Sequence, residues 1–263
     1  MKRVPNAYRE FRPPSRLVTS VECFWTSYAE TDGPHRVYPD GCMDLMYTRE
    51  GGRSWLEVIG AMTEYVDAGA TKGTEIFAIR FRPGGMGLPL EASELRDTAV
   101  EWQAIHPHDA RLLKTRLDDA TTVSERIAIC SAVLPAPETD SVRRAIAELE
   151  RMRGMADLNW LARQANVSER QFRRLCVARA GLAPKQLARI LRFRNSLRKL
   201  RGAKRGDLAA LALDCGYYDQ AHFIHEFHLF TGESPVRFLQ SSSGALPLHS
   251  MHESDSDSHN GAD

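Results

Sequence analysis

Short apolar runs separated by turn-forming residues dominate the first 130 residues of the chain. The clearest runs are Val18–Trp25, Asp44–Tyr47, Leu56–Ile59 and Ile76–Phe81, and glycine, proline or aspartate residues lie between them. Short or alternating apolar runs of this kind favour β-strands over helices. The pattern therefore predicts a mostly antiparallel sheet in this part of the chain.

The pattern becomes helical from Ala110 onward. The segments RLLKTRLDDA and SERIAICSAVL repeat apolar residues at helical spacing. Two prolines and their acidic neighbours interrupt this pattern in Pro135–Asp140, which predicts a linker. The next segment, SVRRAIAELERM, again has apolar residues at helical spacing, and we expect Ser141 to cap that helix.

The segment from residue 157 to residue 181 has the layout of a helix-turn-helix unit. We expect a short helix over Leu158–Ala165, a three-residue turn, and a second helix capped by the hydroxyl of Ser168. Apolar residues form one face of the second helix and arginines occupy the other faces. Gly181 is expected to end this helix in the left-handed conformation.

The same layout returns about 50 residues later, between Asp207 and Gly232. Gly216 supplies the turn of this second unit, and Asp219 is placed to cap its second helix. Between the two units, Lys185–Leu200 predicts a linker helix of about 24 Å. Such a helix, with the widths of the units added, holds two DNA-reading elements close to one DNA turn of about 34 Å apart.

Composition and cysteine usage narrow the class of protein. The chain is 43% hydrophobic and 26% charged, and none of its apolar runs approaches the roughly 20 residues of a membrane helix. The N-terminal residues lack the apolar core of a secretory signal. The five cysteines are far apart in the sequence, which favours reduced thiols and a cytoplasmic location over a disulfide framework.

The distribution of charge is more informative than the net charge of +1. Residues 141–240 carry 19 lysines and arginines against 9 acids, whereas residues 1–140 carry 16 against 21. A basic block of this size beside an acidic one is typical of a DNA-binding domain joined to another domain. We therefore expect a regulatory domain over residues 1–135, a DNA-binding domain over residues 136–240 and a disordered tail over residues 241–263.

The predicted fold class is α+β. A β-rich N-terminal domain with trailing helices precedes an all-α C-terminal domain of two helix-turn-helix units joined by a linker helix. Residues 158–239 resemble the DNA-binding domain of AraC/XylS-family transcription regulators over their whole length. LARQANVSERQFRRLCVARAGLAP is similar to that family's first unit, and LALDCGYYDQAHFIHEFHLFTGESPVRFL is similar to its second.

The resemblance implies a set of DNA contacts. The base-reading positions of the family fall on Arg170, Arg173, Arg174, Gln220, Ala221, His222 and His225. Arginine makes paired hydrogen bonds to guanine in the major groove, and glutamine does so to adenine. Basic residues between and beside the units are candidates for phosphate contacts: Arg192, Arg194, Arg198, Lys199, Lys204 and Arg205. The implied partners are double-stranded DNA, RNA polymerase, a small-molecule effector and a second copy of the chain.

The N-terminal segment VYPDGCMDLMY, with the later FRPGG, resembles a poorly characterised domain found on a subgroup of these regulators. A plain β-turn at Pro39–Gly41 explains part of this segment. The alternative is that its polar residues border an effector pocket: Asp40, Cys42, Asp44, Arg80 and Arg82. The sequence does not name the effector, the operator or the oligomeric state.

A metal site and one other class of function, an enzyme fused to the DNA-binding domain, are weighed against a one-component regulator. His222, His225 and His228 repeat every three residues, but no cysteine or carboxylate cluster joins them, so we expect no metal site and no cofactor. A DNA-repair enzyme fused to this type of DNA-binding domain needs clustered cysteines, which this chain lacks. No serine–histidine–aspartate, phosphate-loop or HExxH motif is present either. The sequence favours binding over catalysis.

Overall fold

The computed structural model describes residues 8–87, 91–136, 140–202 and 208–241. Residues 8–136, called the β part below, are built on a six-stranded sheet in the order β1-β2-β7-β4-β5-β8. All neighbouring strands in this sheet are antiparallel. The strands are β1 (Arg9–Phe11), β2 (Val21–Tyr28), β7 (Glu75–Phe81), β4 (Met43–Glu50), β5 (Arg53–Ile59) and β8 (Ala99–Glu101).

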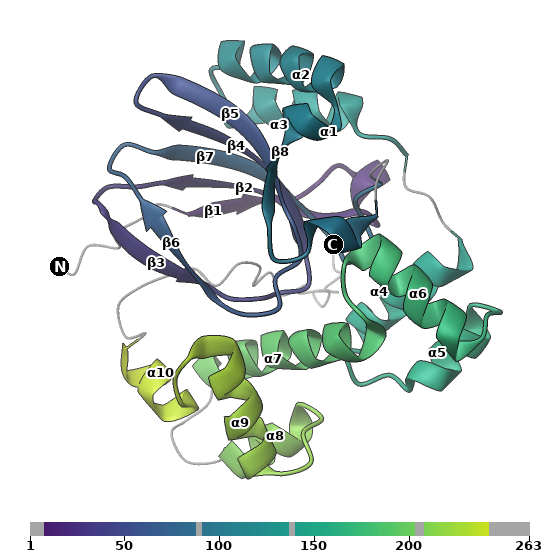
Figure 1. The fold of residues 1–263 in the computed structure, drawn as a ribbon. Helices are drawn as coiled ribbons and strands as arrows, with labels where there is room; N and C mark the ends of the chain where they lie inside the picture. Colours follow the sequence, from purple (N-terminus) through teal and green to yellow (C-terminus); the bar gives the residue numbers. More distant parts are fainter. Residues whose placement is uncertain (1–7, 88–90, 137–139, 203–207, 242–263) are drawn as a thin grey trace, which may run out of the picture.

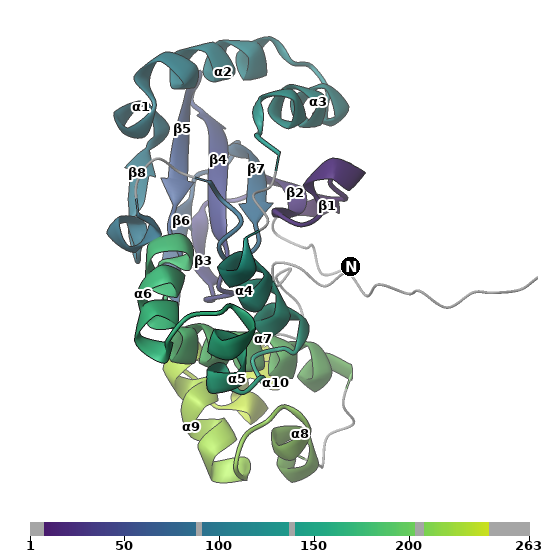
Figure 2. The same ribbon diagram turned by 90° about the vertical axis from the view of Figure 1, so that its right-hand side faces the viewer.

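Side chains alternate between the two faces of this sheet, as the period of two along a strand requires. On one face, apolar residues such as Phe24, Leu45 and Ile79 are fully buried. They belong to the same core cluster as Leu113 and Leu117 of α2 (Pro107–Asp119). In both views, α2 and α3 (Val123–Val133) lie at the end of the β part that is farther from α7 (Figures 1 and 2).

The other face of the sheet encloses a cavity. β3 (Gly33–Val37) and β6 (Val66–Ala70) form a separate two-stranded antiparallel sheet. Residues from both sheets line a cavity of about 650 Å³. The β part is completed by two short 3-10 helices, η1 (Ser15–Leu17) and η2 (Ala92–Leu95), and by α1 (Trp102–Ile105).

Residues 140–241, called the helical part below, contain seven described helices. These are α4 (Ser141–Arg151), α5 (Leu158–Gln164), α6 (Glu169–Ala180), α7 (Pro184–Gly202), α8 (Leu208–Asp214), α9 (Gln220–Thr231) and α10 (Pro235–Ser241). Helix α7 runs beneath the β part, with α4–α6 near one end and α8–α10 near the other (Figure 1). The predicted fold class is confirmed: a β-rich region with trailing helices precedes an all-α region.

Most predicted elements are present, with shifts at their ends. The four predicted strands correspond to β2, β4, β5 and β7, and the predicted linker helix corresponds to α7. The prediction that Ser141 caps α4 is wrong. Asp140 accepts a hydrogen bond from the backbone N–H of Arg143 at 2.9 Å, and the Ser141 hydroxyl donates to the carbonyl of Ala165 instead. The predicted tail from residue 242 onward lies outside the described residues.

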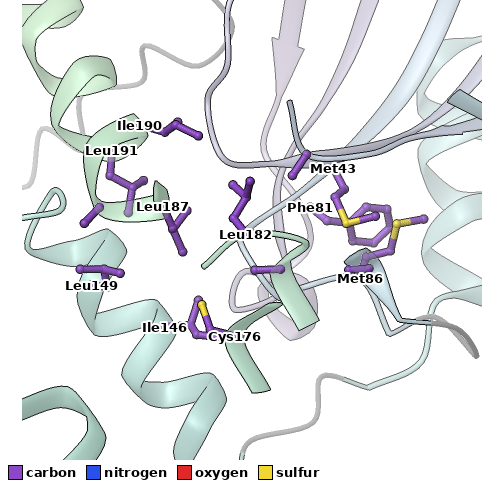
Figure 3. Close-up of a cluster of buried hydrophobic side chains, with 14 of the residues drawn as sticks. Met43, Phe81, Met86, Ile146, Leu149, Cys176, Leu182, Leu187, Ile190 and Leu191 are labelled. Atoms are coloured by element: carbon purple, nitrogen blue, oxygen red, sulfur yellow. The ribbon is translucent and has the colours of Figure 1, made fainter. Parts of the chain in front are cut away.

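One hydrophobic core runs through both parts. Met43, Phe81 and Met86 of the β part lie beside Leu182 and Leu187 of the helical part (Figure 3). Ile146, Leu149, Cys176, Ile190 and Leu191 continue the same cluster into α4, α6 and α7. This core excludes water from the facing apolar surfaces of the β part and the helical part. Apolar burial therefore contributes to holding the two parts together.

Polar contacts at the interface hold each end of the helical part. Arg82 forms an ion pair of 2.7 Å with Glu150 of α4. Arg36 donates a hydrogen bond of 3.0 Å to the carbonyl of Thr231 at the end of α9. Between these two contacts, Arg194 of α7 pairs with Glu22 of β2. The β part therefore contacts α4, which precedes the first predicted unit, the end of the second unit, and the helix that joins the two units.

Candidate nucleic-acid interface

The first predicted unit consists of α5 and α6. Asp157 caps α5 by accepting a hydrogen bond of 2.6 Å from the backbone N–H of Trp160. Asn166, with φ of 55°, turns the chain between the helices. Ser168 then caps α6 in a capping box with Gln171. Gly181 ends α6 in the left-handed conformation, with φ of 73°, as predicted.

Helix α6 presents a row of arginines to solvent. Phe172, Cys176 and Ala180 form its buried face, which orients the opposite face outward. Arg170, Arg173 and Arg174 occur at i, i+3 and i+4 and are all exposed. Within the described residues, no ion pair to these arginines is present. Their guanidinium groups are therefore available as hydrogen-bond donors at the N-terminal half of the helix.

The second unit consists of α8 and α9. Gly216 turns the chain between them with φ of 78°, and Asp219 caps α9 by accepting a hydrogen bond of 2.7 Å from the backbone N–H of His222. Phe223 and Phe227 are fully buried, and Gly232 ends α9 in the left-handed conformation with φ of 75°. The predicted cap, turn and final glycine of this unit are all confirmed.

The exposed face of α9 differs in chemistry from that of α6. Gln220, Ala221 and His225 are exposed at the N-terminal half of α9, where they have no buried role. His222 is half-buried: its ring lies edge-on to Tyr217, and its Nδ1 accepts a hydrogen bond from the backbone N–H of Tyr218. This contact orients the ring and leaves Nε2 as the atom of His222 that remains for other contacts.

Helix α7 fixes the two units relative to each other. Arg192 donates a hydrogen bond of 3.0 Å to the carbonyl of Gly154, which follows α4. Toward the second unit, Arg189 forms an ion pair of 2.7 Å with the buried Glu226 of α9. Phe193 is fully buried and contacts the rings of Phe227 and Phe230. With 19 residues, α7 is about 28 Å long.

Comparison with known proteins identifies both parts of the chain at the level of families. Residues 161–241 match the family model described as a helix-turn-helix domain. The C-terminal part of this chain therefore contains a helix-turn-helix domain. Residues 9–101 match a model described as a domain of unknown function (DUF6597). A search among curated proteins found no match.

Several solved structures are similar to parts of this chain. A transcriptional regulator from Chromobacterium violaceum with an AraC-type DNA-binding domain is 21% identical, and the match covers 39% of this chain and 93% of that one, with a TM-score of 0.35. The C-terminal domain of AraT, a response regulator from Geobacillus stearothermophilus, is 20% identical over 44% and 96% of the chains, with a TM-score of 0.37. ToxT from Vibrio cholerae is 9% identical over 84% and 99%, with a TM-score of 0.45.

The residues predicted to contact DNA phosphates fall into three groups. Arg192, Arg198 and Lys199 are half-buried, and Lys199 also pairs with Asp214. Lys204 and Arg205 lie outside the described residues. The prediction for Arg194 is contradicted by its position: its side chain is buried against the β part and paired with Glu22, so it does not reach a phosphate in this arrangement.

Four of the five effector candidates line the cavity of the β part: Asp40, Cys42, Asp44 and Arg80. Arg82 does not, because its side chain turns to Glu150 and to the carbonyl of Val18. Sequence reasoning missed Trp25, Thr48 and Glu57, which face the same cavity. The available signal was the strand period, since Thr48 lies four residues after Asp44 and therefore on the same face.

The described residues also bear on other kinds of site. They contain no group of three or more histidine, cysteine or acidic residues placed to hold a metal ion. None of the helices described here is long and apolar enough to cross a membrane. All five cysteines are free and buried, and burial raises the pKa of Cys130 and Cys176 to about 12. These thiols are therefore protonated and unreactive at neutral pH.

Proposed function

We propose that this protein is a sequence-specific transcription regulator that binds double-stranded DNA with α6 and α9 in successive segments of the major groove. The observation that carries the proposal is the exposed row Arg170, Arg173 and Arg174 on α6, which has no ion pair within the described part of the chain. Exposed Gln220, Ala221 and His225 at the matching end of α9 support it. Both sets occur near helix N-termini, which is where recognition helices contact base edges.

The geometry of α7 supports simultaneous binding of both helices. A rigid helix of about 28 Å between two units suits elements separated by about one DNA turn. Because α7 is anchored to both units, a DNA site with another spacing has to bend or twist. The energy of that deformation adds selectivity for deformable sequences between the two contacted elements.

We further propose that the β part regulates DNA binding. An effector in its cavity, or a second copy of the chain, would act through the contacts that the β part makes with α4, α7 and α9. Regulation of this kind requires that the ligand favours one arrangement of these contacts over another. The same proposal includes RNA polymerase as the protein partner at the promoter and a cytoplasmic location, which the free cysteines support.

Fluorescence anisotropy with labelled duplexes tests the DNA-binding proposal. The double variant Arg173→Ala/Arg174→Ala should lose most of the affinity difference between a selected site and random DNA. The control is Arg53→Ala, which removes an exposed arginine from the β4–β5 hairpin. Full retention of sequence preference by the folded double variant would contradict the assigned role of α6.

A further inference from the structure

The cavity of the β part has a floor made by the helical part. Its walls are the six-stranded sheet and the β3–β6 sheet, and Arg194 and Leu197 of α7 and Phe238 of α10 also line it. Its volume of about 650 Å³ lies within the range of pockets that hold small molecules. A molecule in this cavity would contact α7 directly.

The strand register arranges the cavity-facing residues of the sheet in rows. Asp44 of β4 is opposite Arg80 of β7 and Ile59 of β5. In the next row, Met46 of β4 is opposite Glu57 of β5. Asp44 and Glu57 are therefore diagonal neighbours on the same face, and such residues have Cα atoms about 7–8 Å apart. A single positively charged group between them is within reach of both carboxylates.

Negative charge exceeds positive charge around this position. Asp40 and Asp44 share one guanidinium, since Arg80 Nε lies 3.4 Å from an oxygen of each. Glu57 also lines the cavity and accepts a hydrogen bond from the indole of Trp55 at 3.2 Å, with no ion pair to it among the described residues. The other two arginines of the lining are engaged elsewhere, Arg36 with Asp67 and Arg194 with Glu22.

The ionisation of Asp44 depends first on its burial and then on the charges around it. Burial raises the pKa of Asp44 to about 6, because the attraction of Arg80 does not outweigh the loss of solvent and the repulsion from Asp40. A further positive charge nearby would stabilise the ionised form of Asp44. His35, also in the lining, supplies none at neutral pH, because burial lowers its pKa.

Several polar atoms of the cavity have no hydrogen-bond partner among the described residues. Arg80 is 1% exposed, Thr48 is 4% exposed and Thr74 is 9% exposed. Nη1 of Arg80 and the hydroxyl oxygens of the two threonines are all unpartnered. Buried polar groups without partners are costly. A hydroxyl or carbonyl oxygen on a bound molecule would satisfy some of them.

Aromatic rings complete the lining. Trp25 lies in the row between those of Asp44 and Thr48 across β7, and its indole N–H donates a hydrogen bond of 2.7 Å to Asp44. The ring of Tyr8 lies 5.6 Å from that of Trp25, and Trp55 of β5 lies opposite Thr48 on the same cavity-lining face. Tryptophan and tyrosine faces attract cations in addition to offering apolar surface.

We propose that this cavity binds an organic cation with an aromatic or apolar body, its positive group held between Asp44 and Glu57 beside Trp25. An anion is disfavoured because the guanidinium of Arg80 is already flanked by the carboxylates of Asp40 and Asp44. The role of this cation as the effector rests on the proposed function, whereas its binding does not.

A charge series of similar shape tests the proposal on the full-length chain. The probes are benzyltrimethylammonium, the neutral benzyl methyl sulfone and the anionic phenylmethanesulfonate, each titrated by calorimetry in the absence of DNA. The cation should bind with at least about tenfold higher affinity than the neutral probe, and the anion more weakly still. Glu57→Gln and Asp44→Asn should each reduce cation affinity at least fivefold, about 1 kcal/mol.

Controls make the outcomes decisive. Glu64→Gln removes an exposed carboxylate outside the cavity lining and should leave cation affinity unchanged. Equal affinity for the three probes, preference for the anion, or no cation binding at millimolar concentration would overturn the proposal. Cation binding unaffected by Glu57→Gln in a folded variant would overturn it as well. DNA binding measured on the same preparations separates this failure from a failure of the proposed function.

Discussion

In the proposed function, three exposed arginines on α6 are the side chains on which selective DNA binding should depend most directly. Arg170, Arg173 and Arg174 lie on the face opposite Phe172 and Cys176, and no ion pair among the described residues engages them. Unpaired guanidinium groups lose no existing contact when they bind a base. This is why the effect of removing one of them should appear in DNA binding and not in stability.

Arg174→Ala should weaken binding to a selected DNA site by about 1–3 kcal/mol and relax the preference at one base position. Its affinity for random DNA should fall much less, because phosphate contacts supply most of that affinity. Competition titrations against single-base variants of the site measure both effects. Uniform weakening across all sequences would show that Arg174 contacts phosphate and not a base.

The Glu22–Arg194 pair should make stability depend on pH. Burial opposes ionisation of Glu22, but Arg194 and Arg80 outweigh it and lower the pKa of Glu22 to about 2. Because the folded-state pKa lies below the unfolded value, the stabilisation is complete above about pH 4.5 and is lost as the pH falls toward 2. Urea unfolding of the wild type across this window should therefore show a steep loss of stability.

Glu22→Gln supplies the matched comparison for this pH effect. At neutral pH it should destabilise the protein by about 3–5 kcal/mol, because Arg194 is left buried without its partner. Below about pH 4.5 the difference between the two proteins should shrink. Stability curves that stay parallel from pH 7 to pH 3 would contradict the assigned ionisation of Glu22.

Arg194 also shows where sequence reasoning fails at this scale. The exposed arginines of α6 were predictable, because neighbouring apolar residues on the same helix define which face is buried. Arg194 lies among Arg192, Arg198 and Lys199 in the sequence. Its local sequence therefore does not distinguish it from these other candidates for phosphate contacts. Its partner Glu22 lies 172 residues away in the sequence, so no local pattern indicates that this arginine is buried.

At the element scale, local chemistry explains which parts of the fold were predictable. The caps at Ser168 and Asp219 and the final glycines of α6 and α9 depend on residues within a few positions, and all four are confirmed. The strands β3 and β6, with sequences GPHRV and VDAGA, were not predicted. They lack the alternating apolar residues that indicate a strand. They form by pairing with each other beside the cavity, and the local sequence does not indicate that pairing.

Gly181 ends α6 and also lies against η2. Replacing it therefore tests the contact between α6 and η2. Its φ of +73° already disfavours a side chain, and an added Cβ would lie 3.0 Å from the carbonyl oxygen of Ala92. Gly51→Ala is the control, since that glycine also has a positive φ, of +55°, but nothing lies within 4 Å of the added atom.

We expect Gly51→Ala to destabilise the protein by about 1 kcal/mol, from backbone strain alone. Gly181→Ala should cost clearly more, because strain and the steric clash add. Chemical denaturation of both variants gives the comparison. Equal losses would mean that η2 moves freely away from α6 and that this interface contact is weak.

At the scale of the whole molecule, the β part contacts the helical part near both of its ends independently of α7. Arg82 pairs with Glu150 beside the first unit, and Arg36 donates to the carbonyl of Thr231 at the end of the second. Three connections thus define the relative positions of α6 and α9. A change in the β part has a direct structural route to α6 and α9, the helices proposed to read DNA, without any need for disorder or unfolding.

Loss of either contact should relax the requirement for a fixed spacing in DNA. One base pair inserted between two contacted elements rotates one against the other by about 34°. The wild-type protein should bind such a site severalfold more weakly than the parent site, and Arg82→Ala or Arg36→Ala should reduce this penalty. The Arg53→Ala control should retain it in full. An unchanged penalty in both variants would show that α7 alone sets the spacing.

Selection of bound sequences from a random DNA pool by the full-length chain tests the central claim most directly. Binding by both α6 and α9 predicts a motif of two elements about one helical turn, or roughly 10 base pairs, apart. Arg173→Ala/Arg174→Ala should erase one element and leave the other. A motif with a single element, or enrichment that does not exceed that of non-specific DNA, would contradict simultaneous reading by the two helices.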